Sequence, residues 1–111
     1  MAKSSQDVFA SAAEEAALRK LEGLRTLNLG EALSLPEAEA EDIVVAGKEV
    51  QLTVFRQTGI PNLPDAVLIT AQIIRAGLGG LISYHYERGL VFLPNGGNRD
   101  ATEDELLATD G

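Results

Sequence analysis

The chain has 111 residues, a net charge of −8 and 45% hydrophobic residues, and it contains no cysteine. This composition predicts one globular domain over residues 1–111, and it excludes wholesale disorder, disulfide bonds and thiolate chemistry. No stretch has the roughly 18 apolar residues that a membrane helix needs, and the N-terminus has no apolar signal segment. We therefore expect a cytoplasmic protein that has no membrane partner.

The negative charge is unevenly distributed along the chain. Residues 31–42 carry five acids and no base, and the tail over residues 95–111 carries five acids and one arginine. Residues 43–94 hold four bases against three acids. Binding to DNA or RNA needs a basic stripe that neutralises phosphates, and the sequence has none, so we expect no direct nucleic-acid partner.

The first predicted element is a long helix that begins near Gln6, after a serine cap, and stops at about Gly30. Its apolar residues recur with helical spacing on one side: Phe9, Ala13, Ala16, Ala17, Leu21 and Leu24. The alanines make this side slim, so that a sheet can approach it closely. Residues 30–42 follow as a predicted acidic linker on the surface.

Two runs of β-forming residues, Ile43–Val45 and Val50–Phe55, predict a hairpin in which Gly47 supplies the turn conformation. Ala66–Arg75 is apolar on both faces, which is typical of a central strand that is covered on both sides. The glycine-rich residues 76–80 predict a connection between strands.

Residues 82–94 predict a second hairpin whose three-residue loop spans 87–89 and places Gly89 in a left-handed conformation. This register puts a group of apolar residues on one face: Ile82, Tyr84, Tyr86, Leu90 and Phe92. The opposite face then holds Ser83, His85, Val91 and Leu93. A one-residue slip would scatter the apolar group.

The segment Thr102–Glu105 predicts a capping box that opens a short C-terminal helix through Leu107. With only two leucines, this helix is expected to dock weakly or to fray. The predicted fold class is therefore α+β, with a long N-terminal helix packed on one face of a four- to five-stranded mainly antiparallel sheet, and with a short C-terminal helix.

The second face of the predicted sheet is uncharged, half apolar and rich in short hydrogen-bonding side chains. Its residues are Gln51, Thr53, Phe55, Leu68, Thr70, Gln72, Ile74, Ser83, His85, Val91 and Leu93. One long helix can cover only one face of such a sheet, so the chain lacks a cover for this second face. We expect it to form a homodimer contact. A small-molecule pocket that is roofed by the acidic linker is the competing interpretation.

Candidate residues for chemistry are few. His85 could act as a general base beside Ser83, but only Glu87 is near enough to orient the ring, and no nucleophile motif is present. Arg56 and Arg75 end their strands, and they could clamp an anion if they met at one edge of the sheet. Salt bridges to Asp65 or to the acidic linker account for them equally well.

No metal site or cofactor is predicted, because a single histidine without cysteine cannot supply a ligand set. These features favour a small non-enzymatic binding or assembly module that acts as a homo-oligomer or with another protein. The alternative is a small-molecule binding protein or an enzyme that uses the polar sheet face around His85.

Overall fold

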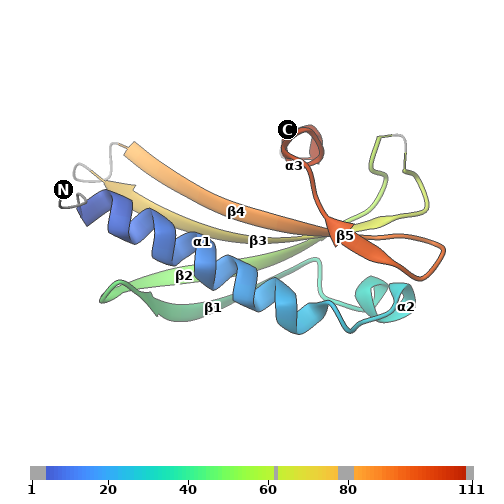
Figure 1. Cartoon of the computed structure of the whole chain (residues 1–111), viewed down its shortest axis with the longest axis horizontal. Helices are drawn as coiled ribbons and strands as arrows, with labels where there is room; N and C mark the ends of the chain where they lie inside the picture. The colour runs from blue at the N-terminus through green and yellow to red at the C-terminus, as the bar shows by residue number, and fades with distance from the viewer. Residues whose placement is uncertain (1–4, 62, 78–81, 110–111) are drawn as a thin grey trace.

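The computed structural model describes residues 5–61, 63–77 and 82–109. Within these residues, five strands form one antiparallel sheet whose spatial order follows the chain, and a long helix packs against it (Figure 1). The elements are α1 (Ser5–Leu24), α2 (Leu29–Leu33), β1 (Ala38–Val45), β2 (Lys48–Gln57), β3 (Val67–Gly77), β4 (Ile82–Phe92), β5 (Asn98–Asp100) and α3 (Glu103–Thr109). The predicted α+β fold class is confirmed.

Helix α1 packs on the sheet through the predicted apolar side, where Phe9, Ala13, Ala17 and Leu21 are buried. The ring of Phe9 meets the ring of Tyr86 edge to face, with their centroids 5.5 Å apart. Because alanine has almost no side chain, the helix axis can approach β3 and β4 closely. Figure 1 shows α1 running along this face of the sheet.

The expectation that the helix continues to Gly30 is wrong, because α1 ends at Leu24 and Gly30 lies inside α2. Asn28 explains the change, since its side chain accepts a hydrogen bond from the backbone N–H of Glu31 at 2.8 Å. Glu31 returns the bond to the N–H of Asn28 at 3.0 Å, which completes a capping box. The serine cap predicted for α1 falls partly on residue 4, outside the described residues.

The acidic segment 30–42 is not a linker, since it contains α2 and most of the edge strand β1. Ala38–Asp42 pair with residues 51–55 of β2, and their side chains are exposed. A charged edge strand is favourable because it discourages association with other strands. The predicted hairpin turn is confirmed, as Ala46 and Gly47 have φ values of 50° and 77°.

Strand β4 also corrects the prediction, because residues 82–92 form one continuous strand rather than a hairpin. Gly89 makes no turn. A Cβ atom at this position would lie 3.0 Å from the side chains of both Ala101 and Leu106. Glycine is therefore needed for close packing of α3. The predicted faces survive, because even-numbered residues share one face in either arrangement.

A second apolar cluster lies on the sheet face that α1 does not cover. Its buried members are Ile60, Ala66, Leu68 and Val91, with Leu63, Leu93, Ala101 and Leu106 packed around them. The cover comes from the loop before β3 and from α3, so the C-terminal tail is docked rather than loose. Among the described residues, no helix is long and apolar enough to cross a membrane.

Two glycine-to-alanine substitutions test the docking of α3. Gly89→Ala should lower the free energy of unfolding by about 1–3 kcal/mol, because the added methyl group overpacks the contact with Leu106. Gly23→Ala is the matched control, since no atom lies within 4 Å of its added Cβ. It should raise the free energy of unfolding by about 0.5–1 kcal/mol. Urea unfolding measures both, and an unchanged Gly89→Ala protein would contradict the close contact.

Candidate functional site

The candidate site is the part of the second sheet face that α3 leaves uncovered, which we call the open face. Its residues are Ala40, Asp42, Val44, Glu49, Gln51, Thr53, Phe55, Gln72, Ile74, His85 and Glu87. Strand pairing places them in rows across the sheet. One row runs Asp42, Gln51, Ile74, His85, and the next runs Ala40, Thr53, Gln72, Glu87.

Apolar side chains remain accessible on the open face. Ile74 is 47% exposed and Val44 is 68% exposed, while Phe55 is half-buried. Thr53 and Gln72 are also half-buried, and together with Ile74 they form an uncharged centre. Such a surface can lose its water at little electrostatic cost.

The predicted second face is divided into two parts by α3 and the loop before β3. Leu68, Thr70 and Val91 are buried, and Leu93 is half-buried beside them, so these residues are not available to a partner. The statement that the chain has no cover for this face is thus wrong for the half near Leu68. The sequence signals for the cover were the capping box at Thr102 and the glycine at position 89.

His85 points away from the face that α1 covers, as predicted, and it lies opposite Ile74 in the sheet. The side chains of Ser83 and Tyr84 lie outside the described residues. A groove of about 290 Å³ beside His85 is lined by Glu14, His85, Tyr86, Glu87, Glu103 and Leu106. The groove follows the edge of β4 rather than the centre of the open face.

The predicted pocket that is roofed by the linker does not form. Leu29 and Leu35 pack with the core beneath α1, which places the segment before β1 on the opposite side of the sheet. Their apolar side chains are stabilised there by burial against α1 and the strands. The open face therefore has no roof from this segment.

Arg56 and Arg75 do not meet, so the predicted anion clamp is wrong. Arg56 lies opposite Ile69, six positions along β3 from Arg75, which corresponds to about 20 Å. The Nε of Arg56 donates to the Leu35 carbonyl at 2.7 Å. The guanidinium of Arg75 lies 4.5 Å from the centroid of the Phe9 ring. Both cations thus support the fold, and in the described part of the chain no cluster of three acidic or histidine side chains is placed to hold a metal ion.

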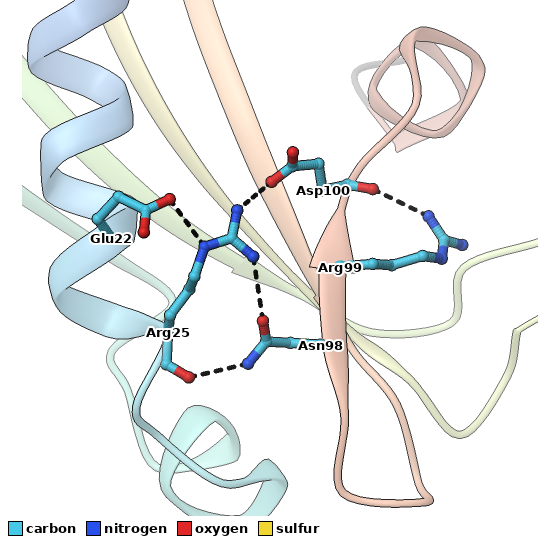
Figure 2. A network of polar contacts seen from close by, with 5 residues as sticks. All are labelled: Glu22, Arg25, Asn98, Arg99 and Asp100. Atoms are coloured by element: carbon cyan, nitrogen blue, oxygen red, sulfur yellow. Dashed lines mark hydrogen bonds and ion pairs between the residues drawn. The ribbon is translucent and has the colours of Figure 1, made fainter.

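An arginine network that the sequence did not indicate joins β5 to the end of α1 (Figure 2). Arg25 donates to Glu22 at 2.8 Å, to Asn98 at 3.3 Å and to Asp100. The Asn98 amide donates back to the Arg25 carbonyl at 2.8 Å. The hydrogen bonds that Arg25 donates, first to Glu22 and then to Asp100, raise the pKa of Arg25 above its ordinary value.

A second ion pair fastens α3 to the opposite side of β5. The two Nη atoms of Arg99 donate to the two carboxylate oxygens of Glu105, at 2.7 Å each. Glu105 also accepts from the Thr102 N–H at 2.9 Å, and its own N–H donates to the Thr102 hydroxyl at 3.2 Å, so the predicted capping box is confirmed. The hydrogen bonds from Arg99 are the main cause that lowers the pKa of Glu105 to about 2, and in turn they raise the pKa of Arg99.

Comparison of the chain with protein family models, with curated proteins and with solved structures gave no match. Function is therefore inferred from the surfaces of this chain alone. Among the described residues, two surfaces differ from an ordinary solvated exterior. One is the open face, which is uncharged at its centre, and the other is the groove along the edge of β4.

The ion pair at Glu105 predicts a specific loss of stability in acid. A carboxyl whose pKa is lowered by folding stabilises the native state above the pKa of the unfolded chain, about 4.5, and this stabilisation disappears as the pH falls toward 2. The difference in unfolding free energy between the wild type and Glu105→Gln should be largest at neutral pH and should shrink between pH 4.5 and pH 2.

Urea unfolding at a series of pH values measures this difference. Glu103→Gln is the control, because Glu103 is an exposed acid in the same helical turn. A difference for Glu105→Gln that stays constant with pH would show that the carboxylate does not stabilise the docked helix.

Proposed function

We propose that the protein is a small non-enzymatic assembly module that forms a homodimer through the open face. The observation that supports this proposal is the exposure of Ile74, which lies on the central strand beside the uncharged side chains of Gln51 and Gln72. Val44 and Phe55 add apolar surface elsewhere on the same face, and association would remove all three side chains from water. Association about a two-fold axis buries this surface in both copies at once, because the same residues serve each copy.

The polar residues of the open face suit such a contact. Gln51, Thr53 and Gln72 carry uncharged groups that can donate or accept hydrogen bonds across a two-fold axis. The acids of the open face lie outside its centre, since Asp42 is on the edge strand β1, Glu49 is next to the β1–β2 turn and Glu87 is on β4. The charge therefore stays at the rim. Burial of the centre therefore requires no unpaired charge to lose its water.

The size of the open face predicts a weak dimer. Four strands about 4.8 Å apart and six residues of about 3.3 Å each span an area on the order of 400 Å² per copy. Stable protein interfaces bury about 800 Å² per partner. We therefore expect a dimer that dissociates in the micromolar range rather than a permanent one.

The alternative function, small-molecule binding or catalysis around His85, has less support. Ligand pockets are concave and bury most of their ligand, whereas the open face has no roof from the segment before β1. His85 is exposed, and the nearest groove follows the edge of β4. A specific ligand is therefore a less suitable occupant of this face than a second copy of the chain.

A pair of charge insertions tests the homodimer. Ile74→Lys should weaken the dimer by about tenfold or more, because a lysine at the centre of the contact must lose its water without a partner. Val8→Lys is the matched control, since Val8 is 48% exposed, nearly the same as Ile74, but it lies on α1. It should leave the dimer unchanged.

Sedimentation over a range of concentrations measures both variants. A wild type that remains monomeric up to about 1 mM would contradict the proposal. Equal weakening by the two substitutions would show that association does not use the open face. Leu68→Asp is unsuitable for this test, because Leu68 is fully buried beneath α3 and its substitution would unfold the second cluster.

A further inference from the structure

The outer edge of β4 is only partly occupied. β5 pairs with residues 90–92 of this strand, and toward the start of β4 no described strand continues the sheet on this side (Figure 1). The Gly89 carbonyl faces this edge, because it accepts a hydrogen bond from the Ala101 N–H at 2.8 Å. Backbone groups alternate in direction along a strand, so the N–H and carbonyl of His85 face the same edge.

The edge lies in a groove that has α1 on one side and α3 on the other. Two adjoining cavities of about 220 Å³ and 290 Å³ share Glu14, Glu87, Glu103 and Leu106 in their linings. Apolar surface is present on each side, from Leu18 on α1, which is 39% exposed, and from Leu106 on α3. The edge therefore combines outward backbone groups with two side walls, which are the features that hold an added strand.

The groove carries an excess of negative charge. Its lining includes two arginines, and both are engaged, Arg25 with two acids and Arg88 with Glu14 at 3.2 Å. The acids outnumber them, and they are Glu14, Glu22, Glu87, Asp100 and Glu103. The charge of the groove therefore complements a basic segment.

A second copy of the chain is a poor occupant of this groove. Two β4 edges that paired across a two-fold axis would bring Glu14 and Glu103 of each copy toward the same acids of the other, and like charges would repel. The edge of β1 is a weaker candidate site for a partner. Its side chains at residues 38–42 are exposed, and the carboxylate of Glu41 already forms an ion pair with Lys20 at 3.4 Å.

We propose that the edge of β4 before Gly89, around His85 and between α1 and α3, takes up an extended basic segment of a partner protein as an additional strand of the sheet. Side chains of an added strand alternate between its two sides. On one side they meet Glu14 and Leu18 of α1, and on the other side they meet Glu103 and Leu106 of α3. Each side thus offers an acid and a leucine, so the preferred segment carries basic and apolar residues on both of its sides.

Synthetic peptides test the proposal without any change to the protein. The probe is a fluorescent peptide in which pairs of lysines alternate with pairs of valines, so that each side of the strand carries both residue types. It has about nine residues, a length typical of a long strand. A version with glutamate in place of lysine should not bind, because it meets like charge. A version with N-methyl groups on alternate backbone nitrogens should bind about tenfold more weakly, because it cannot donate to the edge. Fluorescence anisotropy at low salt measures each affinity.

Two proline substitutions identify the edge. His85→Pro removes an outward N–H from β4 and should weaken binding by about tenfold. Ala40→Pro does the same on the edge of β1 and should leave binding within about twofold. Ala40 is the matched position on β1. The Glu37 carbonyl accepts from the Arg56 N–H and therefore faces β2. Because backbone groups alternate in direction along a strand, the N–H and carbonyl of Ala40 face outward.

The acids are tested by Glu103→Gln, which should weaken binding about threefold, with Glu49→Gln on the distant β1–β2 hairpin as its unaffected control. Weaker binding by Ala40→Pro but not by His85→Pro would overturn the proposal in favour of the edge of β1. Equal affinity of the N-methylated and the unmodified peptide would also overturn the proposal, since charge alone would then hold the peptide. This comparison uses the wild-type protein, so it remains valid even if His85→Pro does not fold. Protein concentrations below those that produce the homodimer keep this test separate from the proposed function.

Discussion

The close contact between α1 and the sheet is the constraint on which the rest of the structure depends. Ala13 and Ala17 are fully buried against the strands, and their small side chains let the helix lie near enough for Phe9 and Leu21 to fill the core. A single helix placed in this way can shield only one face of a five-stranded sheet. The second face must therefore be covered by shorter segments, by a partner, or by both.

The C-terminal tail supplies part of that cover, and its attachment combines three contacts. Leu106 packs on Leu68, Gly89 permits the close approach, and the Arg99–Glu105 pair fixes the first turn of α3 to β5. Because α3 is short, it shields only the half of the face near Leu68. The exposed half around Ile74 follows directly from this difference in length.

The two surfaces that remain differ in charge, and this difference assigns them different proposed partners. The open face is uncharged at its centre, so it suits a second copy of the same chain. The groove along β4 is acidic, so it disfavours a second copy and suits a basic segment. A net charge of −8 makes the rest of the surface self-repulsive, which disfavours association between copies outside the proposed contact.

Local pattern in the sequence determined the helix over most of α1, the strands β2 and β3, the turn at Gly47, the capping box at Thr102 and the side of the sheet on which His85 lies. Each of these depends on residues a few positions apart, which periodicity and capping rules describe. The tertiary structure alone decided that β4 is continuous and that Arg25 joins Asp100, a contact between residues 75 positions apart. Gly89 shows the reason, because a glycine that permits a turn and a glycine that permits close packing are identical in sequence. Only the position of α3, set by burial of Leu106, distinguishes the two.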